Sequence, residues 1–149
     1  MKPQHLVFLL VGIAISVLFF VFRETFYDTL YYNTEFNNNL YNLGLYNIFA
    51  IVTIAFTWLG AAVYYYAINS VRFDRWWHWL IVLAIVCVLC PAVCYIISLN
   101  SFARAGMDYA FEAFVFQVTN LVWAALLFIV ASFSMRWWSS NCRHTPFPQ

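Results

Sequence analysis

Four long apolar runs dominate the 149-residue chain. They cover residues 6–22, 45–68, 76–99 and 113–135, so each is about 17 to 24 residues long. An α-helix of this length crosses the ~30 Å hydrocarbon core of a bilayer, because it rises ~1.5 Å per residue. Charged residues make up only 9% of the chain, which leaves too little polar chain to shield four buried core helices. The pattern predicts an all-α membrane protein, with four transmembrane helices in a single domain.

The connections and their charges predict how these helices are oriented. Only residues 69–75 separate the second run from the third, so an antiparallel bundle is expected. With four spans, five basic residues share one side of the membrane: Lys2, Arg72, Arg75, Arg136 and Arg143. Arg23 and Arg104 fall on the other side. Because Lys and Arg are enriched in cytoplasmic loops, both termini are expected in the cytoplasm, with the chain in a bacterial inner membrane.

The first run has an alternative interpretation as a cleaved signal peptide, since Lys2 precedes it. The run is long for a signal core, and no small-x-small cleavage site follows it. We therefore expect it to remain as the first helix.

Residues 23–44, the outer arm, are the one sizeable polar segment, rich in asparagine and tyrosine. Tyrosine favours the headgroup level of a membrane, where its ring is apolar and its hydroxyl is wet. We expect the arm to lie along the membrane surface, to begin with a short helical extension of the first span and to contact other proteins. The candidate contact residues are Tyr31, Tyr32, Asn38, Tyr41 and Tyr46.

Small and polar residues recur at three-four spacing in all four runs. In membranes such residues let helices approach closely and form hydrogen bonds between helices. The predicted packing seam comprises Gly12, Ser16, Thr53, Thr57, Gly60, Cys87, Cys90, Cys94, Gln117, Asn120 and Ala124. Within the third run, Pro91 is expected to kink the helix.

The cysteines of the third run admit a second interpretation. Cys87 and Cys90 have the spacing of a redox dithiol, as in four-helix membrane oxidoreductases. Such an enzyme also needs a water-facing cysteine pair, and the outer segments contain no cysteine. The packing interpretation is therefore favoured.

Other chemistry finds little support in the sequence. None of the four runs contains Asp, Glu, Lys or Arg, which argues against a proton-coupled carrier. His5, His78 and His144 lie at the cytoplasmic edge, so intramembrane haem is not expected. Cys142 and His144 form only a weak metal pattern, in a tail expected to be mobile. A net charge of +1 offers no basic surface for nucleic acid. We expect no cofactor, no metal and no enzymatic activity.

The leading functional hypothesis is a non-catalytic membrane subunit or scaffold of a cell-envelope assembly for secretion, motility or defence. Its expected partners are the lipid bilayer and other envelope proteins, in an oligomer or hetero-complex. Cytoplasmic partners would meet a basic and aromatic interface belt: Arg72, Arg75, Trp76, Trp77, Arg136 and Trp137. One alternative is a homo-oligomeric channel or pore-forming effector lined by Thr53, Thr57, Gln117 and Asn120. A lesser alternative is the intramembrane thiol-disulfide oxidoreductase.

Overall fold

The computed structural model describes residues 3–146, and within them it contains helices and no strand. Four helical segments are long and apolar enough to cross a membrane. They are α1 (Pro3–Val21), α4 (Leu45–Ala62) with its π-helical continuation η1 (Val63–Ile68), α5 (Trp76–Arg104) and α6 (Ala110–Met135) with the 3-10 turn η2 (Arg136–Trp138). The prediction of an all-helical chain with four such helices is therefore confirmed.

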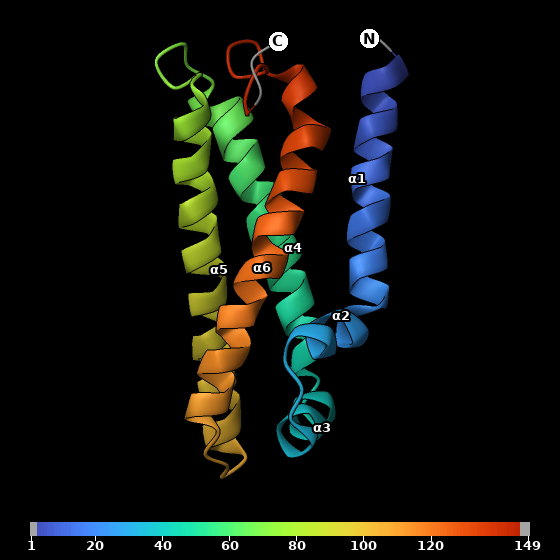
Figure 1. Cartoon of the computed structure of the whole chain (residues 1–149), viewed down its shortest axis with the longest axis vertical. Helices are drawn as coiled ribbons and strands as arrows, with labels where there is room; N and C mark the ends of the chain where they lie inside the picture. Colours follow the sequence, from blue (N-terminus) through green and yellow to red (C-terminus); the bar gives the residue numbers. More distant parts are fainter. Residues whose placement is uncertain (1–2, 147–149) are drawn as a thin grey trace.

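The long helices lie side by side along the long axis of the molecule (Figure 1). Two short helices of the outer arm, α2 (Arg23–Leu30) and α3 (Thr34–Asn42), lie at one end with the α5–α6 connection. We call this the arm end. The α4–α5 connection and both ends of the described chain lie at the opposite end, which we call the belt end (Figure 1).

Local sequence explains where the helices of the arm begin and end. The backbone bends at Phe22, so α2 is a separate helix and does not extend α1. The side chain of Asn33 accepts a hydrogen bond from the Phe36 N–H, which caps the start of α3. Gly44 takes a left-handed conformation (φ 66°) between α3 and α4, a conformation that glycine adopts without steric cost. The structured part of the arm is thus two short helices joined to α4 by a tight turn.

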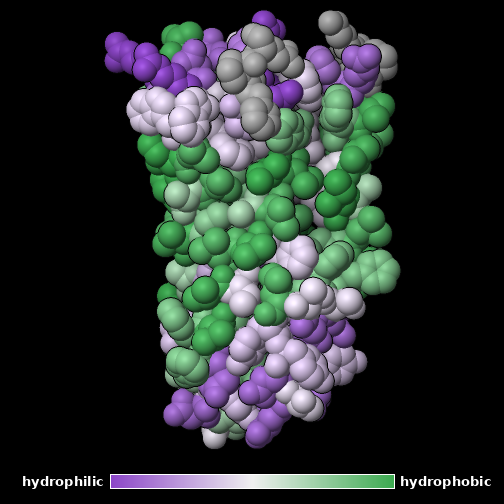
Figure 2. Space-filling model, in the orientation of Figure 1, coloured by the Kyte–Doolittle hydropathy of each residue, from purple (hydrophilic) through white to green (hydrophobic). Residues whose placement is uncertain are grey.

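On the face shown in Figure 2, hydrophobic surface covers the middle of the molecule and polar surface lies at both ends. Among the four long helices, α1 is covered least, with 17% of its spanning window buried in the protein. Its exposed apolar side chains include Val7, Leu10 and Val17, each about half exposed. Exposed apolar side chains between two polar ends form the kind of surface that a bilayer solvates well.

Two glycines allow the helices to pack closely. A side chain at Gly12 of α1 would overlap the Ser134 hydroxyl of α6. A Cβ at Gly60 of α4 would lie 2.5 Å from a methyl group of Val86 on α5. Both positions belong to the predicted packing seam, and both occur where two helices meet.

The C-terminal segment differs from the expectation of a mobile tail. Cys142 is fully buried and Thr145 is 2% exposed. The Tyr65 hydroxyl donates to the Thr145 carbonyl at 3.0 Å, and the Tyr66 hydroxyl donates to the Met135 carbonyl at 2.8 Å. The hydrogen bond from the buried Tyr65 therefore holds Thr145 against η1, and the bond from the exposed Tyr66 joins η1 to the end of α6.

Candidate functional site

The interior of the bundle contains a polar network centred on Thr53 of α4. Its hydroxyl donates to Asn120 Oδ1 of α6 at 3.4 Å and lies 3.3 Å from the Tyr27 hydroxyl of α2. The Cys90 thiol of α5 donates to the Thr53 hydroxyl oxygen at 3.5 Å. Asn120 also donates to Gln117 Oε1 at 3.0 Å. One threonine hydroxyl thus links four helices at membrane depth.

The other seam residues lie around this network. Ten of the eleven are buried, and Gly60 is half-buried. Ser16 of α1 accepts a hydrogen bond from the Trp58 indole N–H at 2.9 Å, which ties α1 to α4. The Thr57 hydroxyl donates to the Thr53 and Ile54 carbonyls of its own helix. The seam side chains therefore face one another inside a single chain.

The three cysteines of α5 are packed inside this interior. Cys87, Cys90 and Cys94 are all buried free thiols, and Cys142 is a fourth at the belt end. Among residues 3–146, no set of three or more His, Cys, Asp or Glu side chains is placed to hold a metal ion.

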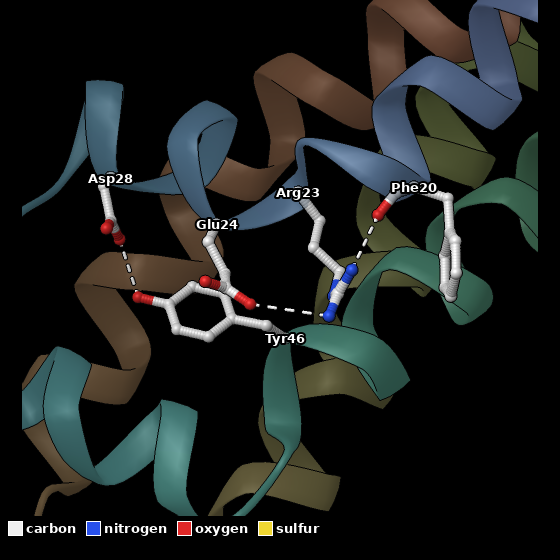
Figure 3. A network of polar contacts seen from close by, with 5 residues as sticks. All are labelled: Phe20, Arg23, Glu24, Asp28 and Tyr46. Carbon is white, nitrogen blue, oxygen red and sulfur yellow. Dashed lines mark hydrogen bonds and ion pairs between the residues drawn. The ribbon is translucent and has the colours of Figure 1, made fainter.

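The outer arm is fastened to the bundle through Asp28 of α2. Its Oδ1 accepts hydrogen bonds from the Tyr46 hydroxyl at 2.6 Å and from Asn37 Nδ2 at 2.7 Å. Figure 3 shows this carboxylate above the Tyr46 hydroxyl, and it shows Arg23 and Glu24 nearer to the junction of α1 and α2. There Arg23 donates to the Phe20 carbonyl at 3.0 Å and pairs with Glu24 at 3.4 Å. Charged groups thus hold α2 to the start of α4 and to the end of α1.

A second set of contacts fastens the arm to α6 and its connection. The Tyr109 hydroxyl donates to Glu35 at 2.9 Å and accepts from Asn39 Nδ2 at 3.0 Å. The hydrogen bond to the Glu35 carboxylate raises the pKa of Tyr109. The Trp123 indole of α6 donates to the Phe26 carbonyl at 3.1 Å. The arm is therefore held in one position by residues from α4, α6 and the α5–α6 connection.

The five candidate contact residues of the arm fall into two groups. Tyr32 and Tyr41 are 65% and 63% exposed, and Asn38 is also exposed. Tyr46 is 3% exposed and Tyr31 is half-buried, because both rings pack against Phe116 of α6. Three of the five candidate residues are therefore exposed on the arm, whereas Tyr31 and Tyr46 pack against α6.

The belt residues also separate by exposure. Arg72, Arg75, Trp76 and Trp77 are exposed at the start of α5. Arg136 is only 7% exposed, and its guanidinium lies over the rings of Phe133 and Trp137 at 4.8 and 4.3 Å. Arg136 was expected to face cytoplasmic partners, but its side chain is packed inside the protein. Trp137 lies beside it and is half-buried.

A cavity of about 840 Å³ lies among the exposed belt residues. Arg72, Arg75 and His78 line it from the α4–α5 connection and α5, and His144 lines it from the C-terminal segment. Asp74 is the one acidic residue in its lining. The belt residues and the C-terminal segment thus form a common basic cavity.

Asn69 joins the two segments that form this cavity. Its side-chain oxygen accepts hydrogen bonds from the Ser139 hydroxyl and the Asn141 N–H, both at 2.9 Å. Its amide nitrogen donates to the Ser140 hydroxyl, and its carbonyl accepts from Asn141 Nδ2 at 2.6 Å. A positive φ of 28° at Asn69 ends the π-helical turn and aims these groups at residues 139–141.

Sequence reasoning did not single out Asp28, Asn69 or the cavity. Asp28 and Asn69 are ordinary polar residues in polar segments, and their roles depend on partners that are far away in the sequence. The sequence did place Arg72, Arg75, His78 and His144 on the same predicted side of the membrane. The cavity was still missed, because the C-terminal segment that carries His144 was expected to be mobile.

No protein-family model, curated protein or solved structure matches this chain.

Proposed function

We propose that the chain is a non-catalytic membrane subunit whose outer arm docks a partner protein of the cell envelope. In this proposal four helices cross the bacterial inner membrane in alternating directions, with both termini in the cytoplasm. The belt end then faces the cytoplasm and the arm end faces outward. The distribution of Lys and Arg supports this orientation.

The observation that carries the proposal is the rigid attachment of an exposed aromatic surface. Tyr32 and Tyr41 expose most of their rings, while hydrogen bonds to Asp28 and Tyr109 hold the helices beneath them. Tyrosine is enriched at protein interfaces, because it contributes a large contact area with few rotatable bonds. A surface that is already ordered also loses less conformational entropy on binding.

The interior network supports a structural role over a pore. Thr53, Thr57, Gln117 and Asn120 would have to face water in a channel, yet at most 3% of any of them is exposed. The Thr53–Asn120 hydrogen bond joins α4 to α6, while Asn120 and Thr57 make further hydrogen bonds within their own helices. These contacts favour a bundle that serves as a platform for the arm.

Site-specific photo-crosslinking in native membranes tests the docking surface. A benzophenone side chain at position 32 or 41 is expected to yield a discrete crosslinked product with a second protein. Phe111 offers a matched control, because it is 75% exposed and begins α6 at the arm end, outside the arm. Absence of a product at 32 and 41, or an identical product at 111, contradicts the proposal.

Cysteine labelling tests the orientation separately. The four native cysteines are buried, so an introduced surface cysteine is expected to react first. Asn38→Cys is expected to react with a membrane-impermeant maleimide in cells whose outer barrier is opened and whose inner membrane is intact. Arg143→Cys is expected to react only after the inner membrane is broken. The reverse pattern would invert the assigned topology.

A further inference from the structure

The basic cavity at the belt end leaves positive charge without a protein partner. The guanidinium groups of Arg72 and Arg75 make no ion pair and no hydrogen bond with the described residues. Only one carboxylate, that of Asp74, shares the lining with them. Clustered positive charge in a concave site concentrates anions.

The start of α5 adds donors to the same cavity. Arg75 precedes the 29-residue helix in an extended conformation, and no side chain caps its first turn. The free N–H groups and the helix dipole at such a start favour a bound anion, phosphate in particular. His78 lines the cavity as well, is 8% exposed, and its Nδ1 has no hydrogen-bond partner. The cavity therefore combines guanidinium, backbone and imidazole groups that suit a phosphate.

An apolar groove continues from this cavity toward the middle of the bundle. The groove encloses about 520 Å³ and is lined by Trp79 and Leu80 of α5 and by Ile129 and Phe133 of α6. Trp76 and Pro146 line both the cavity and the groove, so the two spaces adjoin. A free phosphate would occupy the cavity alone, whereas a phospholipid would fill both with its headgroup and an acyl chain.

We propose that the belt end binds one anionic phospholipid. Its phosphate lies between Arg72 and Arg75 at the start of α5, and an acyl chain lies in the groove between α5 and α6. The exposed tryptophans Trp76 and Trp77 stand at the level where indole rings meet lipid headgroups. The site is at the opposite end from the outer arm, so it does not depend on the docking proposal.

Native mass spectrometry of the delipidated full chain tests this site. The probes are phosphatidylglycerol and phosphatidylcholine with identical acyl chains, added in equal amounts. Wild-type protein is expected to retain phosphatidylglycerol roughly tenfold better, because each basic side chain near a headgroup favours an anionic lipid. Arg72→Gln with Arg75→Gln is expected to abolish that preference, while Arg72→Lys with Arg75→Lys is expected to keep most of it.

Arg104→Gln is the matched control, since it removes an exposed arginine from the arm end. It is expected to keep the lipid preference. Equal retention of both lipids by the wild type, or an unchanged preference after Arg72→Gln with Arg75→Gln, would overturn the proposal.

Two further variations separate a lipid from a free anion. Excess inorganic phosphate is expected to leave phosphatidylglycerol bound, and its full displacement would assign the cavity to a free anion instead. Leu80→Trp narrows the groove and is expected to lower retention of both lipids. Unchanged retention in that variant would exclude the acyl-chain part of the proposal.

Discussion

Asp28 at the arm end and Arg72 at the belt end are both charged residues close to a helix terminus, but their surroundings differ. Asp28 accepts two hydrogen bonds from neighbouring side chains of the arm and α4. Arg72 makes no side-chain hydrogen bond with the described residues and lines an open cavity. The arm end thus uses its charge to fix its own structure, whereas the belt end leaves charge available to a ligand.

This difference separates the proposed roles of the two ends. At the arm end the satisfied charges leave an outward surface of tyrosine and asparagine, which suits a protein partner. At the belt end unpaired arginines adjoin tryptophans and an apolar groove, which suits a lipid. Variants at corresponding positions of the two ends therefore test the comparison directly.

The largest expected effect follows from Asp28→Ala. This change removes the charged acceptor of the Tyr46 hydroxyl and leaves Asn37 Nδ2 with only its longer bond to the Tyr31 carbonyl, at a cost of about 3 kcal/mol in the free energy of unfolding. Reversible unfolding in mixed micelles measures it. Asp74→Ala is the control from the belt end and is expected to change stability by less than about 0.5 kcal/mol, because Asp74 is exposed. Similar losses in both variants would remove the distinction between the ends.

Asn69→Ala tests how the belt end is held together. It removes the side-chain bonds to Ser139, Ser140 and Asn141 and places alanine at a positive φ. Cleavage by trypsin after Arg143 is expected to be faster by about tenfold, since the C-terminal segment opens more often. Asn42→Ala, at an exposed position of the arm end, is expected to leave that rate unchanged. Equal rates for wild type and Asn69→Ala would contradict the structural role of Asn69.

A smaller effect is expected in the interior between the two ends. Thr53→Val keeps the shape of the side chain but loses the hydroxyl that contacts Tyr27, Cys90 and Asn120, at about 1 kcal/mol. Cys87→Ala is expected to be tolerated, because alanine is also small. A loss of activity in a thiol-oxidation assay after Cys87→Ala would instead favour the oxidoreductase alternative.

The smallest expected effect is a pH dependence at the belt end. Burial raises the pKa of the Cys142 thiol above its ordinary value of 9.0. The buried thiol therefore contributes stability that is present below about pH 9 and is lost as pH rises through the folded-state pKa. The melting temperature of wild type is expected to fall more between pH 8 and pH 10 than that of Cys142→Ala. Equal falls would show that Cys142 carries none of this dependence.

The sequence predicts the long helices well, because each apolar run has the length and composition that a membrane imposes. The spacing of small residues also places Gly12 and Gly60 where a Cβ would meet another helix. Local patterns are less informative about partners. The contacts of Asn69 with residues 139–141 span about 70 positions of the chain, and no short-range signal encodes them. The same limit applies to the exposure of the arm tyrosines, since Tyr46 differs from Tyr41 through contacts with Asp28 and Phe116 that no local pattern encodes.

The unequal lengths of the long helices have a consequence for bilayer thickness. At ~1.5 Å per residue, the 19 residues of α1 match the ~30 Å hydrocarbon core, whereas the 29 residues of α5 exceed it by about nine residues. The surplus has to tilt or protrude beyond the lipid. At the arm end, α5 continues beyond the end of α1, and α2 and α3 lie beside this part of α5 (Figure 1). A thicker membrane would draw more of α5 into lipid and bring the arm closer to the headgroups, so bilayer thickness is expected to tune access to Tyr32 and Tyr41.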